Sequence, residues 1–225
     1  MKLRVLSVVV CLTIASACRE SPVDSPVTRP NKITDFAFLY ARNCAGCHGI
    51  GGKGGAAVGL ADAVYLTIAD DSTIRRITST GIPGTSMPAF AQASGGMLTD
   101  DQIEVITRGI RAWAKPDAVR DAPPYAMEIP GDPAKGVAVY DEYCKTCHGV
   151  AGRGGRASSI VDISYLTLVS DQSLRTTVIV GRPEMGAPDW RANVPGKPMS
   201  PQEVSDVVAW ISTQRGQPKL EGAIR

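Results

Sequence analysis

Apolar positions recur at helical spacing in two segments that lie about one hundred residues apart in the chain. They are Ile103, Ile106 and Ile110 in the first segment, and Val204, Val207, Val208 and Ile211 in the second. Thr99 with Gln102 forms a capping box just before the first segment. Ser200 with Glu203 does so before the second. The pattern predicts two amphipathic helices, one after each capping box, whose apolar sides face a core.

Two further helices are predicted upstream of these. Thr34 or Asp35 can cap a helix that runs into Cys44. Asp132 followed by Pro133 combines an N-cap with a proline at the first helical position, which is a sharper start signal. The sequence therefore predicts an all-α fold in which one helical unit occurs twice.

Matching residues show which positions of the two units correspond. Tyr-Leu-Thr at 65–67 recurs at 165–167, an offset of 100 that becomes 101 after a one-residue insertion. This repeat predicts two domains rather than one. The predicted segments are a domain at 33–114, a proline-rich linker at 115–131, a domain at 132–215 and a tail at 216–225.

Residues 1–17 are predicted to be an export signal. A short basic start precedes an apolar stretch of ten residues, which is too short to span a bilayer and is typical of a signal peptide. Cys18 follows small residues, as in a bacterial lipoprotein cleavage box. We therefore expect Cys18 to carry lipid and to anchor the protein to the membrane, with ordinary cleavage after Ala17 as the alternative. Residues 18–32 are predicted to form a flexible tether.

The charge balance excludes a nucleic-acid binding role. Once Lys2 and Arg4 leave with the signal, the 24 basic side chains become 22, equal to the 22 acidic ones. Such a chain lacks the basic surface that nucleic acid requires. Aromatic residues make up only 5% of the chain, which is low for two domains that fill their cores with side chains alone.

The most specific motif occurs once in each half. Residues 44–48 read Cys-Ala-Gly-Cys-His and residues 144–148 read Cys-Lys-Thr-Cys-His; Cys-x-x-Cys-His is the attachment motif of c-type haem. The two thiols bond to one porphyrin and the histidine coordinates its iron. The predicted haem c residues are Cys44, Cys47 and His48 in the first half, and Cys144, Cys147 and His148 in the second. A zinc site built from the two cysteine pairs is the alternative, but it gives the following histidine no role.

The order of helix, haem motif, methionine loop and C-terminal helix resembles the class I cytochrome c domain over residues 33–113 and 132–214. This resemblance implies two tandem helical domains, each wrapped around one covalent haem c. It also implies an exported protein of the periplasm that transfers electrons between a redox protein donor and an acceptor of the respiratory chain.

The resemblance further implies a methionine as the second axial ligand of each iron. Residues 87–90 match the family's Met-Pro-x-aromatic ligand loop, which makes Met87 the expected ligand in the first half. Residues 187–190 keep this frame in the second half but begin with alanine. Met185 is expected to replace the missing ligand, and Met199 or no methionine at all are the alternatives.

Two other functions compete with a freely diffusing carrier. A haem enzyme or gas sensor, similar to dihaem peroxidases or thiosulfate dehydrogenases, would use an open second haem. Both histidines of the chain are already assigned to iron, which leaves none as a distal acid–base group. The third interpretation is a tethered haem subunit of a larger respiratory complex, such as a terminal oxidase.

Overall fold

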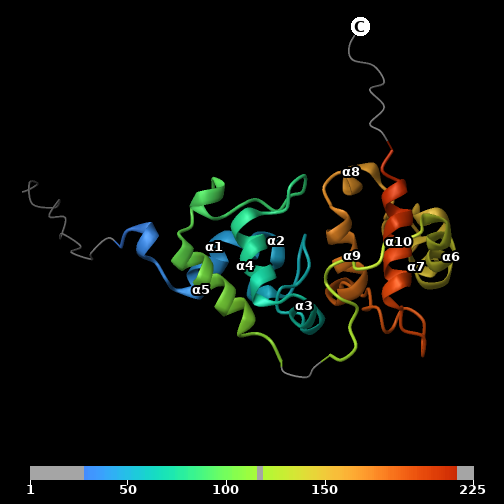
Figure 1. Ribbon diagram of the computed structural model, residues 1–225, viewed down its shortest axis with the longest axis horizontal. Coiled ribbons are helices and arrows are strands. Elements are labelled where there is room, and N and C mark those ends of the chain that lie inside the picture. The colour runs from blue at the N-terminus through green and yellow to red at the C-terminus, as the bar shows by residue number, and fades with distance from the viewer. Residues whose placement is uncertain (1–27, 116–118, 217–225) are drawn as a thin grey trace, which may run out of the picture.

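The computed structural model describes residues 28–115 and 119–216. Over these residues its regular structure consists of helices, short 3₁₀ turns and two isolated β-bridges, which confirms the predicted all-α class. The two halves lie beside each other and are joined by an extended linker (Figure 1). The predicted signal at 1–17, Cys18 with its predicted lipid, and the tail from residue 217 lie outside the described residues.

The α-helices follow one another at corresponding positions in the two halves. The first half contains η1 (Pro30–Lys32), α1 (Phe36–Asn43), α2 (Ala45–His48), η2 (Ile50–Gly52), α3 (Ala63–Ile68), α4 (Asp71–Thr80), η3 (Gln92–Ser94) and α5 (Asp100–Arg111). The second half contains α6 (Pro133–Tyr143), α7 (Lys145–His148), η4 (Val150–Gly152), α8 (Ile163–Leu166), α9 (Asp171–Val180), η5 (Pro183–Met185) and α10 (Pro201–Thr213).

Local sequence signals set the starts of the long helices. The Asp35 carboxylate accepts a backbone hydrogen bond at 2.7 Å, so Asp35 rather than Thr34 caps α1. Asp132 caps α6 in the same way. The capping boxes predicted at Thr99 and Ser200 form with both of their hydrogen bonds, and they start α5 and α10.

The predicted apolar stripes form the cores. Ile103 and Ile106 of α5 are fully buried, and so are Val204 and Val207 of α10. In each half the C-terminal helix packs on the N-terminal one, α5 on α1 and α10 on α6. Burying each of these side chains contributes about 1.5–3 kcal/mol to folding.

The close helix crossing places a glycine against an aromatic residue, and the helix that carries the glycine differs between the two halves. In the first half a Cβ on Gly109 of α5 would lie 2.1 Å from the ring of Phe36 in α1. In the second half the glycine is Gly136 in α6, where a Cβ would lie 2.6 Å from the Cβ of Trp210 in α10. Only a residue without a side chain allows this approach.

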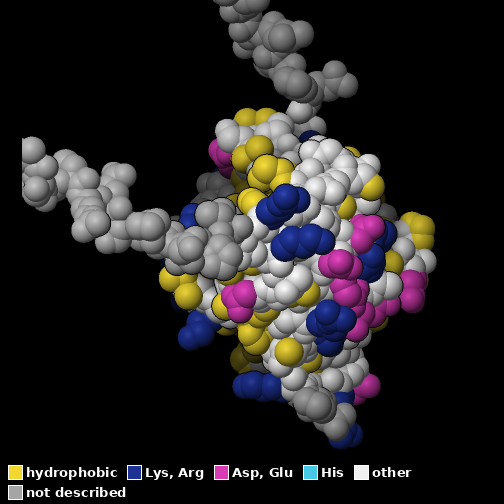
Figure 2. All heavy atoms as spheres, turned by 90° about the vertical axis from the view of Figure 1, so that its left-hand side faces the viewer, with side chains coloured by type: hydrophobic (Ala, Val, Ile, Leu, Met, Phe, Trp, Pro, Cys, Tyr) yellow, Lys and Arg dark blue, Asp and Glu magenta, His cyan; other side chains and the backbone are white. Residues whose placement is uncertain are grey.

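The outer side of the first half, which carries η1, presents basic and acidic side chains interspersed with scattered apolar ones (Figure 2). No large patch of one sign is visible on that face. This agrees with the even charge balance of the sequence.

The linker is fastened to the second half by a buried arginine. Arg175 of α9 is 1% exposed. Its guanidinium donates to the Pro124 carbonyl at 2.9 and 3.1 Å, to the Tyr125 carbonyl at 3.2 Å and to the Ser205 hydroxyl at 3.1 Å. All of these acceptors are neutral, so the charge is balanced by hydrogen bonds rather than by a bonded carboxylate.

Replacing Arg175 by methionine is expected to destabilise the second half by about 2–4 kcal/mol, because buried linker carbonyls lose their donors. Urea unfolding of the haem-loaded protein, followed by far-ultraviolet circular dichroism, measures this loss. The matched control is Arg75→Met at the equivalent position of α4. The Arg75 side chain is 43% exposed and pairs with Glu104 at 2.8 Å, so its loss should cost less than about 1 kcal/mol. Equal losses in the two variants would contradict a role for the linker contacts.

Candidate haem sites

The first haem motif occupies a kink between two helices. Cys44 ends α1 and precedes the single turn of α2, with φ −118° and ψ −38°. The backbone N–H groups of Cys47 and His48 both donate to the Cys44 carbonyl, at 3.2 and 2.9 Å. This turn brings the two sulfur-bearing residues to one side of the chain, with the histidine next to them. The second motif repeats the turn between α6 and α7.

The thiols of both motifs are free, because none of the four cysteines in the described residues forms a disulfide. Burial, and to a lesser degree the neighbouring Cys47, raises the pKa of Cys44 to about 11. Burial and Cys147 raise the pKa of Cys144 to about 12. These two thiols are therefore neutral near pH 7 and are not the reactive thiolates that a cysteine enzyme uses.

Each motif histidine is held by one ring nitrogen. Nδ1 of His48 lies 2.8 Å from the carbonyl oxygen of Val58, and Nδ1 of His148 lies 2.8 Å from that of Ser158. A carbonyl can only accept, so Nδ1 carries the proton and Nε2 keeps its lone pair. This is the tautomer and the partner that a metal-ligating histidine requires. The residues present therefore fit a haem iron bound at Nε2 in each half.

The electrostatic surroundings also keep His48 neutral. Burial lowers the pKa of its imidazole, the Val58 carbonyl partly opposes this, and the Arg182 guanidinium lowers it further. A neutral imidazole is the form that binds a metal ion. Arg182 belongs to the second half, so this contribution crosses between the halves.

The glycine-rich loop after each motif folds back onto it. Gly54 N–H donates to the His48 carbonyl and Ala57 N–H to the Cys47 carbonyl, both at 2.9 Å. Gly49 adopts φ +78°, and a Cβ there would lie 2.0 Å from the Gly54 carbonyl oxygen. Tyr40 closes the loop by donating its hydroxyl to the Gly49 carbonyl at 3.0 Å. The loop thus returns the chain to the point where Val58 meets the histidine.

The loop predicted to carry the second axial ligand in the first half shares a backbone hydrogen bond with its counterpart in the second half. Ile82 N–H donates to the Met87 carbonyl at 3.0 Å, and Arg182 N–H donates to the Ala187 carbonyl at 2.9 Å. Ala187 therefore stands where the first half has Met87. The two loops share this hydrogen bond but turn differently, because the glycine with positive φ is Gly84 in the first loop and Gly186 in the second, which also contains η5.

The two remaining candidates for the second iron lie in different surroundings. Met185 ends η5, two residues before Ala187, and is 69% exposed. Met199 is 2% exposed, and its N–H donates to the Trp190 carbonyl at 2.9 Å, as Leu98 N–H does to Phe90 in the first half. Met199 thus fills the core position of Leu98, and Met185 stays a prediction as the ligand.

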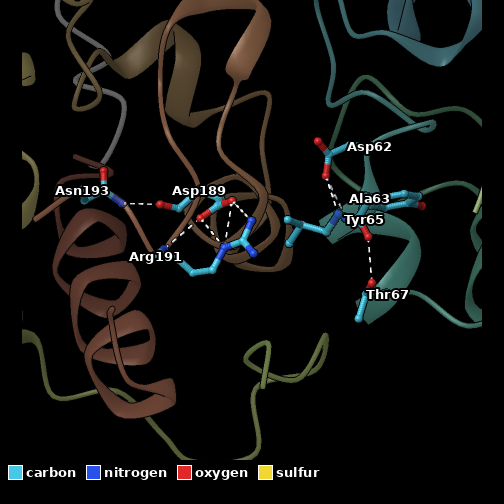
Figure 3. A network of polar contacts seen from close by, with 8 residues as sticks. Asp62, Ala63, Tyr65, Thr67, Asp189, Arg191 and Asn193 are labelled. Atoms are coloured by element: carbon cyan, nitrogen blue, oxygen red, sulfur yellow. Dashed lines mark hydrogen bonds and ion pairs between the residues drawn. The ribbon is translucent and has the colours of Figure 1, made fainter. Parts of the chain in front are cut away.

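Sequence reasoning missed that charged side chains of the two halves lie near each other. Arg191 of the second half forms an ion pair with Asp189 at 2.5 Å and points toward Asp62 of the first half (Figure 3). Asp189, and more weakly Asp62, raise the pKa of Arg191. The Asp62 carboxylate in turn caps α3 by accepting from two backbone N–H groups. The sequence shows that Asp62 can cap a helix, but nothing in it indicates that Asp62 lies near Arg191.

A protein-family comparison assigns both halves. The model described as "Cytochrome C oxidase, cbb3-type, subunit III" matches residues 31–108 and 131–211. The chain belongs to this family. It is a tandem dihaem class I cytochrome c with two covalently bound haem c groups, which confirms the predicted fold class and cofactor.

Curated members of the family share part of their length with this chain. The "Cbb3-type cytochrome c oxidase subunit CcoP" of Azospirillum sp. (strain B510) is 36% identical over 132 residues, covering 54% of this chain and 40% of that protein. The "Cbb3-type cytochrome c oxidase subunit FixP" of Sinorhizobium medicae (strain WSM419) is 25% identical over 169 residues, covering 69% and 53%. The chain thus spans about half the length of these relatives or less.

A solved chain of the Kuenenia stuttgartiensis reducing HAO-like protein complex Kustc0457/Kustc0458 matches at 17% identity with a TM-score of 0.48, covering 84% of this chain and 99% of that one. A likeness at this level adds nothing to the assignment. Within residues 28–115 and 119–216, no helix has both the length and the apolar character needed to cross a bilayer.

Replacing Gly49 by alanine is expected to reduce the amount of haem in the first half and to destabilise it by more than about 2 kcal/mol, because left-handed strain adds to a backbone clash. The matched control is Gly95→Ala. Gly95 also has a positive φ, +86°, but lies in the left-handed helical region with open space around a Cβ, so alanine there should cost only the strain of that region, about 1 kcal/mol. Haem per chain and the urea midpoint measure both variants. A Gly49 variant no worse than its control would rule out the folded-back loop as a requirement.

Proposed function

We propose that this chain transfers electrons between two redox proteins through its haems, as an electron carrier or electron-transfer subunit. The observation that carries the proposal is the repeated motif in which a free thiol pair precedes a histidine held through Nδ1 by a backbone carbonyl. Haem iron supplies one-electron exchange between its two oxidation states. The role of the polypeptide is to hold the iron in a low-dielectric pocket with little rearrangement.

The proposed roles of the motif residues follow from their chemistry. The cysteine thiols bind the porphyrin covalently, Cys44 and Cys47 in the first half. His48 ligates the iron through Nε2 while the Val58 carbonyl fixes the plane of its ring. The equivalent roles in the second half fall to Cys144, Cys147 and His148, with the Ser158 carbonyl as the partner of the histidine.

Removing one thiol pair should remove one haem. Cys44→Ala with Cys47→Ala, and separately Cys144→Ala with Cys147→Ala, are each expected to leave a single covalent haem per chain. Pyridine haemochrome absorbance and intact mass count the haems that remain. Met97→Ala, at an exposed surface methionine, is the control and should retain both. Two haems in either double variant would refute the proposed attachment residues.

We propose Met87 as the second axial ligand in the first half and Met185 in the second. Thioether sulfur is a soft ligand that favours the reduced iron. Met87 stands at the start of the family's ligand loop. Met185 is two residues from Ala187 and precedes Gly186, whose left-handed conformation at φ +79° lets the loop turn. The alternatives for the second iron are Met199 and the absence of any methionine ligand.

Near-infrared spectra distinguish these ligands. Met87→Ala and Met185→Ala are each expected to abolish the iron–sulfur charge-transfer band of one haem and to leave that of the other. Met199→Leu restores the residue that the first half has at the equivalent position, and it should leave both bands unchanged. Loss of a band in Met199→Leu instead would make Met199 the ligand. A second haem that shows no such band in the unaltered protein has no methionine ligand.

The names of the relatives support a proposal about the partner protein of this chain. Because these proteins are named as subunits of cbb3-type cytochrome c oxidases, we propose that a terminal oxidase of this type is the electron acceptor or the complex that holds the chain. The predicted signal and a lipid at Cys18 would place it at the outer face of the membrane, in the periplasm. Co-purification of an oxidase with the chain from solubilised membranes tests the association.

A second candidate function is chemistry or gas binding at the second haem. The observation that favours it is Ala187, which accepts the backbone hydrogen bond that Met87 accepts in the first half but has no side chain that could bind iron. An iron without a protein ligand on that side would accept a small molecule. Rapid binding of carbon monoxide by the reduced protein, at one haem of the two, would support this candidate over a pure carrier.

A further inference from the structure

The two halves meet through different faces. The first half contributes the loop that follows its haem motif, and the second half contributes the loop equivalent to the Met87 loop. A cleft of about 200 Å³ runs between them, lined by Gly52, Lys53, Gly59, Ala61 and Asp62 on one side and by Val180, Gly181, Pro183 and Glu184 on the other. The side of the first haem site that holds the motif histidine therefore faces the side of the second site where the second axial ligand is expected.

A charged pair of the second half lies directly on the first half's loop. Arg182 donates from Nη2 to the Gly55 carbonyl and from Nε to a Glu184 carboxylate oxygen, the latter at 2.6 Å. Glu184 lies against Gly54, where a Cβ would come within 2.7 Å of the carboxylate. The side chains of Arg182 and Glu184 are only 18% and 27% exposed, so water screens them less than a surface pair.

The contacted loop is part of the first haem site. Gly54, next to the residue that accepts from Arg182, donates its N–H to the His48 carbonyl at 2.9 Å. Gly55 N–H donates to the Ala57 carbonyl at 3.1 Å, and Ala57 N–H donates to the Cys47 carbonyl at 2.9 Å. Two hydrogen bonds therefore connect the Arg182 guanidinium to the first motif, one from Arg182 to the Gly55 carbonyl and one from Gly54 to the His48 carbonyl.

The pair has no counterpart in the other half. The positions equivalent to Arg182 and Glu184 are Ile82 and Gly84, which carry no charge. Ile82 and Arg182 make the same backbone hydrogen bond, so this bond does not depend on the charges. The side-chain contacts of the pair with the first half lie at the interface.

We propose that Arg182 and Glu184 of the second half form a balanced charge pair at the domain interface, in which each charge offsets the effect of the other on the reduction potential of the first haem. This rests on the proposed attachment of that haem at residues 44–48. Reduction adds one negative charge at the iron, so a nearby cation favours the reduced state and a nearby anion disfavours it. The two charges oppose each other, and removing either one exposes the other. Neither residue belongs to a haem motif, so both act as positioning charges.

Single neutralisations should move the potential of the first haem in opposite directions. Arg182→Gln leaves Glu184 unopposed and is expected to disfavour reduction, whereas Glu184→Gln leaves Arg182 unopposed and is expected to favour it. The expected change in the reduction equilibrium is roughly threefold to tenfold, and tenfold equals 59 mV for a one-electron couple. The double variant should return to within twofold of the unaltered protein. A spectroelectrochemical titration of the full chain with both haems measures these values, and the haem whose charge-transfer band disappears in Met87→Ala is the first.

Two controls separate charge from support of the interface. Arg182→Lys keeps the charge but loses the planar donor pair, so the potential should stay within twofold of the original. Arg108→Gln removes one exposed positive charge from α5, on the first half, and should also shift the potential by less than twofold. Shifts of the same sign in Arg182→Gln and Glu184→Gln would mean that the pair only supports the interface, and would overturn the proposal.

Unchanged potentials in variants that still carry two haems would also overturn it. Failure of the underlying attachment proposal looks different, because haem counting would then find two haems after Cys44→Ala with Cys47→Ala. The number of haems therefore tests the attachment proposal, and the reduction potential tests the charge-pair proposal.

Discussion

The imidazole of His48 donates from Nδ1 to the Val58 carbonyl, and each half of the chain is arranged so that this bond and its copy at His148 can form. A carbonyl ten residues further along must return to the ring. The glycine-rich loop makes that return possible, because Gly49 adopts a conformation and a closeness to Gly54 that a side chain would forbid. The hydrogen bond then fixes the tautomer and the plane of the ring that ligates the iron.

Features encoded by neighbouring residues could be predicted from the sequence. The capping boxes at Thr99 and Ser200 and the buried stripe around Ile106 depend on residues within one or two turns. The internal repeat extended this reach, because an offset of 100 correctly paired Ala187 with Met87 through their matching backbone bonds. Comparing one half of the sequence with the other showed which residues occupy equivalent positions.

The contacts that could not be predicted join residues that are far apart in sequence. Arg175 bonds to the linker 51 residues away, and Arg182 bonds to a carbonyl 127 residues away. An arginine is typical of a solvated surface, and no periodicity reveals that one is buried or faces another domain. Tertiary packing decides both cases. The exchange of glycine and aromatic residue at the helix crossing was missed for the same reason, since Gly109 and Phe36 reveal their fit only in contact.

The asymmetry between the halves concentrates in one loop. Where the first half has Ile82, Gly84 and Met87, the second has Arg182, Glu184 and Ala187. The loop without a methionine at this position is also the loop that carries the charge pair at the interface, and it keeps the backbone hydrogen bond that Ile82 makes in the first half. Coupling through such a contact is reciprocal. If each charge on this loop biases the oxidation state of the first haem, then the oxidation state of that haem biases the loop. The proposal thus assigns the coupling between the two redox centres to this loop.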